Sequence, residues 1–521
     1  MKELPQKPDL AHLKKQAKEL LKAARARESA ALERLRAALP AAAGKDDASL
    51  RAMDLRLHDA QSCIAREYGF PSWAQLKDYV ETQSTTVEDA PALRARWAVW
   101  AFGAGLQRAK PLLAARLLRE HKALLAGDPS LAAAVGDVAT VLQAIAADPQ
   151  WARQRGSSTA RSPLLRACFS GLVRLPEFAP GIRECAARLL AAGADPNDSL
   201  TEPAFPGDPQ SALYGAAGRN HDAALTRTLL DAGADPNDGE SLYHAAEAAD
   251  PECVRLLLEG GARVEGSNAL MHALDYERPS LLALLLAHGG DPNERIRDVP
   301  LTHALRRRRS KEIVRMLLDA GADPRSRDPN GVPAYRLAVR LGLTDVAAML
   351  REAGASEADD PTEAFLAACA RADREAAEAL LAGTPNLIAA LDETRLRLLP
   401  ELAGSGCSDA VRLMVDLGWP VAVRGGDIDG SALNHAVFRG DSALASFLVA
   451  HGARYDERHG YGDNVYGTLN FASLAETTPG GDWLGCAKAL IEGGNPLPEE
   501  RYTFADDVAD YFEELRKSRQ A

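Results

Sequence analysis

Four histidines are the residues of this sequence with the greatest capacity for chemistry. His244, His272, His303 and His435 each stand directly before an alanine in a short apolar segment. Imidazole is an acid or base near neutral pH and a common ligand of zinc. Matching positions on neighbouring packed helices lie about 8–10 Å apart, whereas the ligands of one zinc ion all lie about 2 Å from it. We therefore expect a structural ladder of histidines and no metal site.

No other pattern indicates catalysis or a bound cofactor. The motifs H-E-x-x-H, G-x-S-x-G and G-x-G-x-x-G are absent, and Gly44-Lys45 lacks the flanking residues of a phosphate loop. The seven cysteines contain no C-x-x-C pair, so neither a zinc site nor a disulfide framework is indicated. We expect a protein without enzymatic activity or cofactor, with its cysteines reduced in the cytoplasm.

A run of arginines is the first surface feature that could bind a partner. Arg306, Arg307, Arg308 and Arg309 end a predicted helix, where cations interact favourably with the helix dipole. Arginine is also enriched among the residues that dominate protein interfaces. These residues are candidates for an anchor that binds an acidic partner, with a merely solvated corner as the alternative.

Aromatic residues form the second candidate surface, because the chain is only 5% aromatic. Residues 455–483 read as a long insertion that contains Tyr461, Tyr466 and Trp483. Long loops on rigid scaffolds often hold binding residues, so these three are candidate contacts. A weaker candidate is Phe205, which lies between prolines in residues 201–210.

A repeated segment supplies the elements that must position these side chains. L-L-x-A-G-A-D-P-N occurs at 189–197 and 229–237, and a shorter copy occurs at 317–324. A leucine-rich helix ends at the glycine, which can adopt a left-handed conformation, and Asp-Pro-Asn then opens a turn. From the glycine at 193 to the one at 493 there are nine intervals over 300 residues, or about 33 residues each. The clearest closing glycines are Gly193, Gly233, Gly261, Gly289, Gly321, Gly354 and Gly452.

Helix–turn–helix units of about 33 residues are typical of ankyrin repeats, which open with T-P-L-H-x-A. Pro300-Leu301-Thr302-His303-Ala304 is close to that opening, and the sequence resembles the ankyrin-repeat family over about residues 92–496. The resemblance implies an all-α solenoid. It also places the four histidines one residue beyond the family's own histidine position. Because two intervals are only 28 residues long, we expect short or trimmed hairpin turns.

The ends of the chain do not follow the repeat. The sequence A-R-E-Y-G-F-P-S-W at 65–73 is similar to the N-terminal segment of a group of uncharacterised bacterial ankyrin-repeat proteins, which implies an architecture but no activity. The predicted organisation is an N-terminal helical module at 1–82, a linker at 83–91, a first half of the repeats at 92–355 (degenerate over 92–160), a seam at 356–361, a second half at 362–496 and a capping helix at 497–521.

Charge and hydropathy restrict the class of partner. The net charge is −12 and the pI is about 5.5, which argues against bulk binding to nucleic acid. The start leads into a charged helix instead of a secretory signal. The longest apolar run, 281–287, falls far short of the roughly 20 residues that span a membrane. We expect a cytoplasmic protein that is a monomer, although the sequence does not determine the oligomeric state.

The predicted function is that of a non-catalytic scaffold or regulator. An unidentified partner protein would bind the concave face made by the first helices and the turn tips. The alternative is a membrane or nucleic-acid adaptor that acts through the basic amphipathic helix after Asp9, with Lys14, Lys15, Lys18 and Lys22 on its polar faces. An enzyme is the third and weakest alternative.

Overall fold

The computed structural model divides into two compact units, residues 1–154 with 161–194, and residues 155–160 with 195–521. It describes the chain except for residues 1, 3, 6–7, 40–41, 43, 47–48, 51–52, 54, 56, 71–72, 85–89, 105–107, 157–160, 202–206, 208, 356, 359, 476, 479 and 521, and the side chains of 58, 74, 78, 81–84, 506 and 520. Most of the predicted linker at 83–91 therefore lies outside the described residues. The predicted domain boundaries remain predictions.

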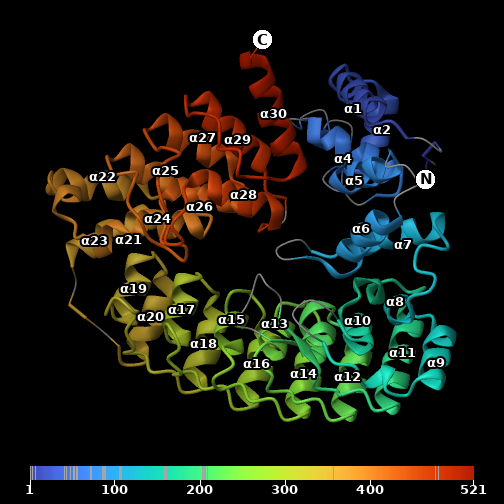
Figure 1. Cartoon of the computed structure of the whole chain (residues 1–521). Helices are drawn as coiled ribbons and strands as arrows, with labels where there is room; N and C mark the ends of the chain where they lie inside the picture. The colour runs from blue at the N-terminus through green and yellow to red at the C-terminus, as the bar shows by residue number, and fades with distance from the viewer. Residues whose placement is uncertain are drawn as a thin grey trace. The chain divides into compact units, whose positions relative to one another are not determined.

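The first unit consists of short helices joined by turns (Figure 1). They are α1 (Leu10–Arg25), α2 (Ser29–Ala38), α4 (Leu57–Glu67), α5 (Trp73–Ser84), α6 (Ala90–Phe102), α7 (Pro111–Glu120), α8 (Pro129–Val135), α9 (Val138–Ala147), η2 (Trp151–Arg153), α10 (Pro163–Phe169), η3 (Gly171–Arg174) and α11 (Ala179–Ala191). From α8 onward they form helix pairs in which α8 packs against both α9 and α10.

Helix α1 is amphipathic. Asp9 begins it by accepting a hydrogen bond from the Ala11 amide, which satisfies one of the unpaired donors of the first turn. Its apolar face, Leu13, Ala17, Leu20 and Ala24, is buried, and the helix packs on α4. Its exposed side chains include Lys15, Lys18 and Lys22. The helix therefore presents a basic face on the surface of its unit.

The second unit is a stack of helix pairs with an inner and an outer row; Figure 1 shows α13, α15 and α17 on one side and α14, α16 and α18 on the other. The inner row is η4 (Tyr214–Arg219, a π-helix), α13 (Ser241–Ala245), α15 (Ala269–Ala273), α17 (Pro300–Arg306), α19 (Ala334–Arg340), α21 (Pro361–Ala370), α24 (Leu398–Gly404), α26 (Ala432–Arg439) and α28 (Val465–Ala475). The outer row is α12 (Ala223–Asp231), α14 (Glu252–Glu259), α16 (Pro279–Ala287), α18 (Lys311–Asp319), α20 (Thr344–Glu352), α22 (Arg374–Gly383), α25 (Ser408–Asp416), α27 (Ser442–Ala450) and α29 (Trp483–Glu492).

Short elements complete the second unit. They are η5 (Ile388–Ala390), α23 (Glu393–Leu396), the strands β1 (Ser199–Leu200) and β2 (Gln210–Ser211), and the last helix α30 (Asp506–Gln520). The strands pair antiparallel, with Ser199 opposite Ser211. Helix α30 packs on α29 and buries Val508 and Phe512. It covers the apolar surface that the last helix pair would otherwise expose.

Each regular repeat closes at a glycine in the left-handed region. The backbone φ of these glycines lies between 86° and 96°, a conformation that costs a residue with a side chain free energy. They are Gly193, Gly233, Gly261, Gly289, Gly321, Gly354 and Gly452. The chain then leaves the outer helix and enters the turn that leads to the next inner helix.

The asparagine of the Asp-Pro-Asn turn forms hydrogen bonds between one repeat and the next. The Asn237 side-chain amide donates to the Gly261 carbonyl at 3.3 Å, and its oxygen accepts from the Arg263 amide at 2.9 Å. Asn197 and Asn293 make the same pair of hydrogen bonds with the following repeat. We name these residues the asparagine staples. The sequence reasoning assigned the asparagine only to opening the turn and missed this second role.

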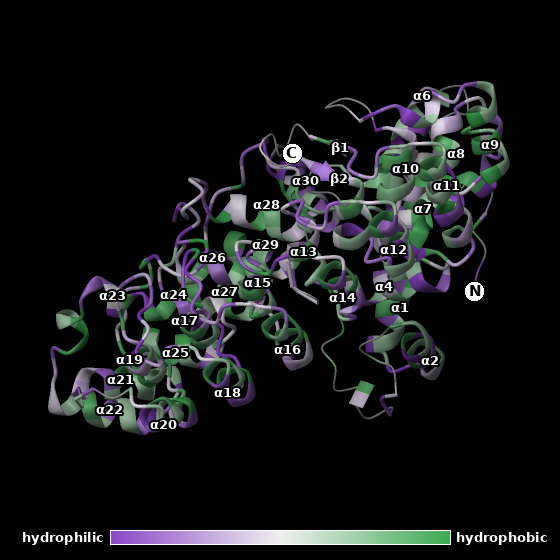
Figure 2. Cartoon of the chain, turned by 90° about the horizontal axis from the view of Figure 1, so that it is seen from below, coloured by the Kyte–Doolittle hydropathy of each residue, from purple (hydrophilic) through white to green (hydrophobic). Residues whose placement is uncertain are grey.

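Small apolar side chains let the helices approach closely. The alanines that follow the four histidines, Ala245, Ala273, Ala304 and Ala436, are at most 2% exposed. Hydrophobic residues lie along the helices, and many of the connecting turns are hydrophilic (Figure 2). The core is thus built from alanine and leucine, as the composition suggests. No helix among the described residues is both long and apolar enough to cross a membrane.

Candidate functional site

Three inner helices carry a row of imidazole and carboxylate groups that alternate from repeat to repeat. His244 Nδ1 lies 2.7 Å from Glu247 Oε1, and the same oxygen lies 3.5 Å from His272 Nε2 in the next repeat. His272 Nδ1 lies 2.9 Å from Asp275 Oδ2. We name the set His244, Glu247, His272, Asp275, His303 and Arg307 the inner-face row.

Asp275 carries the row into a third repeat. Its Oδ1 lies 3.0 Å from His303 Nε2 and 2.7 Å from Arg307 Nε. Each carboxylate therefore links the helix before it to the helix after it. The local sequence explains this geometry, because Glu247 and Asp275 each stand three residues after a histidine, in the turn that directly follows its helix.

The carboxylates control the protonation of the histidines. Burial alone would lower the pKa of His244, but hydrogen bonds to Glu240 and Glu247 raise it to about 9. The pKa of His272 is also raised, because Asp275 and Glu247 outweigh the effect of burial. Burial opposes ionisation of Glu247, yet hydrogen bonds from His244 and His272 hold its pKa well below the usual range. At neutral pH His244 and Glu247 thus form a pair of compensated ions.

Aromatic rings lie against this row. The Tyr243 ring stacks on His272 with centroids 4.1 Å apart, and Tyr276 meets His272 edge-on at 5.6 Å. Tyr214 meets His244 at 5.2 Å. All three tyrosines are partly exposed. In a chain with few aromatic residues, this is a concentration of the amphipathic rings that are enriched at protein interfaces.

The four predicted arginines do not form one basic patch, and this corrects the sequence interpretation. Arg306 pairs with Asp298 and Asp328, two buried carboxylates. Arg307 pairs with Asp275 and with Asp427, which lies 120 residues further along the chain.

The last two arginines are also held by neighbouring groups. Arg308 donates to the Leu341 carbonyl at 2.6 Å. Arg309 donates to the Arg307 carbonyl and lies 3.8 Å from Glu277. Side chains at the end of a helix diverge, so each guanidinium meets a different partner. The cluster holds the unit together, and only Arg307 contributes to the inner-face row.

The fourth histidine does not join the row. His435 is 4% exposed, and its Nε2 lies 2.8 Å from the Gly425 carbonyl oxygen. Burial lowers its pKa and outweighs that hydrogen bond. The expected ladder therefore extends over three histidines and stops before α26.

The predicted aromatic insertion is mostly a regular repeat. Tyr466 lies on α28, is 1% exposed and donates to the Pro496 carbonyl, so its proposed role as a surface contact is corrected. Trp483 is the first residue of α29 and is partly exposed. Tyr461 is 80% exposed at the tip of the 454–464 turn. Phe205 lies outside the described residues.

His244 is a poor general base in this arrangement. A histidine whose pKa is about 9 is protonated at neutral pH and cannot accept a proton as a general base. Within the described residues, no group of three or more histidine, cysteine and carboxylate side chains is arranged to hold a metal ion.

Comparison with known proteins agrees with the helix-pair geometry. The profile of the family described as "Ankyrin repeats (3 copies)" matches residues 179–268 and 213–296. Residues 179–296 are therefore similar to ankyrin repeats. None of the curated proteins matches it at a significant level. The matched residues include His244, Glu247, His272 and Asp275, so most of the inner-face row lies in the part of the chain that is similar to ankyrin repeats.

The sequence reasoning missed four members of this surface, namely Tyr243, Glu247, Asp275 and Tyr276. A signal was present in the sequence, since an acidic residue follows both His244 and His272 at a spacing of three. Asp427 had no such signal, because its contact with Arg307 depends on how distant repeats approach each other.

Proposed function

We propose that the protein is a non-catalytic scaffold that binds a partner protein through the inner-face row and the adjacent rings of Tyr243 and Tyr276. Ankyrin repeats generally are protein-interaction modules. The observation that carries the proposal is the row itself, in which ion pairs join three successive repeats. The partner remains unidentified, and we place this binding in the cytoplasm.

Fixed side chains favour binding. Ordering a mobile side chain at an interface costs about 0.5–1.5 kcal/mol. Here the imidazoles and carboxylates already hold one another, and Tyr243 is stacked on His272. Tyrosine adds apolar contact area and a hydroxyl at a small cost in entropy. A partner would therefore meet a surface that needs little rearrangement.

The test compares aromatic residues on the two faces of the solenoid. The double variant Tyr243→Ala/Tyr276→Ala removes the rings beside the row. Phe447→Ala on the outer helix α27 is the matched control, because Phe447 is also partly exposed and its ring contacts a histidine, His451, with centroids 4.1 Å apart. A photo-crosslinker at position 276 captures the partner, and the affinity of the purified partner is then measured for each variant.

The expected result is a loss of roughly tenfold or more in affinity for the double variant, the size of effect that aromatic hot-spot residues produce. The control should bind as the unaltered protein does, and thermal unfolding checks that both variants are folded. A partner that binds the double variant normally but loses affinity for Phe447→Ala would contradict the proposal.

The exposed lysines of α1 favour a second candidate function, binding to an anionic membrane surface or to nucleic acid. Among them, Lys15 lies 3.9 Å from Glu19 and is the one with a described ion pair. Sedimentation with vesicles rich in phosphatidylserine, at low and high salt, tests this function. Salt-sensitive binding that Lys15→Gln/Lys18→Gln/Lys22→Gln abolishes would support it, and no binding at low salt would remove it.

A further inference from the structure

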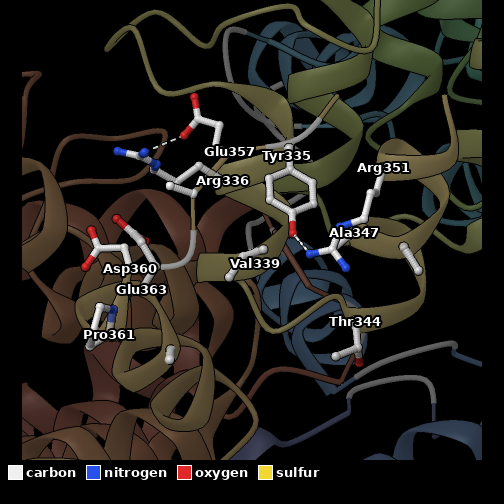
Figure 3. A pocket seen from close by; sticks show the side chains of 13 residues that line it. Tyr335, Arg336, Val339, Thr344, Ala347, Arg351, Glu357, Asp360, Pro361 and Glu363 are labelled. Atoms are coloured by element: carbon white, nitrogen blue, oxygen red, sulfur yellow. Dashed lines mark hydrogen bonds and ion pairs between the residues drawn. The ribbon is translucent and has the colours of Figure 1, made fainter. Parts of the chain in front are cut away.

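A cavity lies beside α20, where residues 353–360 connect this helix to α21. The inner row continues there, because α19 packs on α21. Helix α20 packs on α18 on one side and lines the cavity with its other face. The cavity has a volume of about 440 Å³ (Figure 3). This volume is within the usual range of small-molecule sites, roughly 300–1,000 Å³.

Most of the cavity wall is apolar and made of small side chains. Ala347 and Ala348 come from α20, Val339 from α19, and Pro361 and Ala364 from α21. Because these side chains are short, they leave room between the helices. A ligand with a compact aliphatic body would fill this space and remove apolar surface from water.

The acidic groups of the wall are already neutralised. Glu363 is held by Arg340 at 2.8 Å and by Arg395 at 3.2 Å. Asp360 accepts from the same Arg395 at 3.2 Å. Glu357 pairs with Arg336, as Figure 3 shows. None of these carboxylates is left to attract a cation.

Arg351 is the exception on this wall. Its guanidinium donates to the Tyr335 hydroxyl, and in the part of the chain that the structure describes it makes no ion pair (Figure 3). The Tyr335 oxygen accepts that hydrogen bond, so the hydroxyl proton can be donated to another group. Arg351 and Tyr335 thus offer a positive charge and an O–H donor at one wall of an apolar cavity.

We propose that this cavity binds a carboxylate on a short branched aliphatic chain, with the carboxylate on Arg351 and Tyr335 and the aliphatic body among the alanines. Arg351 is exposed to solvent and has no described ion pair, so it can meet the carboxylate without breaking another pair. Charge-assisted hydrogen bonds are the strong ones. A free acid and a C-terminal leucine carry the same chemical group. The site shares no residue with the inner-face row, so its test does not depend on the proposed protein partner.

The experiment measures binding of 4-methylpentanoate by ligand-observed NMR and compares it with 4-methylpentanamide, which has nearly the same shape but no charge. A short peptide that ends in a leucine carboxylate, compared with its amidated form, tests whether the ligand is the C-terminus of a peptide and not a free acid. The variants are Arg351→Gln, Tyr335→Phe and Ala348→Phe, in which the new ring fills the cavity. Arg315→Gln is the matched control, an exposed arginine on the neighbouring outer helix α18.

We expect the acid or the peptide carboxylate to bind, and the uncharged forms to bind roughly tenfold more weakly. Arg351→Gln should lower the affinity for the carboxylate by a similar factor, and Tyr335→Phe should lower it by less. Ala348→Phe should abolish binding. Arg315→Gln should change nothing. The proposal is overturned if neither carboxylate binds, if acid and amide bind equally, or if Arg351→Gln leaves the affinity unchanged in a folded protein.

Discussion

His272 and His435 occupy the same position in their repeats, one residue before a buried alanine, yet their environments are opposite. His272 lies on the inner-face row between Glu247 and Asp275, and its pKa is raised. His435 is buried beside a backbone carbonyl, and its pKa is lowered. One sequence position thus holds an imidazole with a raised pKa on α15 and one with a lowered pKa on α26.

The turn before α26 accounts for the difference. Residues 424–430 fold over His435, and an added Cβ at Gly426 would lie only 2.5 Å from the imidazole Nε2. The neighbouring Asn434 is buried as well and accepts from the Thr468 hydroxyl at 2.7 Å. The regular repeats have shorter turns in front of the row. The length and path of the preceding turn therefore decide whether an inner-helix position becomes surface or core.

The largest expected effect comes from placing the same cation at both positions. His435→Lys puts a permanent charge at a buried position that has no ion pair among the described residues and lies near the cations Arg307 and Arg439 as well as Asp427. It should lower the free energy of unfolding by about 3–5 kcal/mol. His272→Lys keeps a cation between Glu247 and Asp275 and should cost only about 1 kcal/mol. Urea denaturation of both variants measures the difference. Equal losses would show that charge is tolerated alike in the two regions.

His244, in the same row as His272, and His435 should give the stability opposite pH dependence. The pKa of His244 is raised from 6.5 to about 9, so the stability it contributes is present below 6.5 and is lost as the pH rises towards 9. We expect a loss on the order of 2 kcal/mol, reduced by solvent screening. The pKa of His435 is lowered, so its contribution is present above 6.5 and is lost as the pH falls.

Denaturation at a series of pH values measures the free energy of unfolding on both sides of pH 6.5, which we call the acidic limb and the alkaline limb of the curve. His244→Gln should flatten the alkaline limb and leave the acidic one, whereas His435→Gln should flatten the acidic limb. If His244→Gln left the slope between pH 6.5 and 9 unchanged, its ion pairs with Glu240 and Glu247 would not be the source of the dependence.

The asparagine staples give a smaller effect that belongs to the regular repeats. Asn237→Ala removes two hydrogen bonds to the next repeat and should lower the free energy of unfolding by about 1 kcal/mol. Asn330→Ala is the control, because Asn330 also lies in a turn but its side chain has no described hydrogen bond. Equal changes in the two denaturation midpoints would rule out a stapling role.

The sequence predicted the helix pairs because their signals are local. The leucine-rich helix, the glycine that closes it and the Asp-Pro-Asn turn all lie within nine residues, so Gly233 and its neighbours could be interpreted without a structure. The position of His272 on an inner helix followed from the same register. Local chemistry and periodicity determine these features.

Features that depend on contacts between distant residues could not be predicted. The pairing of Arg307 with Asp427 joins residues 120 positions apart, and nothing near either residue indicates it. Tyr466 was placed on the surface because no local pattern shows that α30 packs over it, with Phe512 at 5.9 Å. The cavity beside Arg351 depends in the same way on how α20 and α21 are joined.

The smallest effect on stability is expected at Tyr461. Its substitution tests whether the region around His435 also binds the partner. The Gly460 amide donates to the Ile428 carbonyl at 2.8 Å and so fixes the turn without help from the tyrosine ring. Tyr461→Ala should therefore change the free energy of unfolding by less than about 0.5 kcal/mol. A loss of partner affinity in this variant would extend the binding surface from the inner-face row to the turn tips of the second region. Unchanged affinity would confine binding to the regular repeats, where the turns that precede the inner helices are shorter.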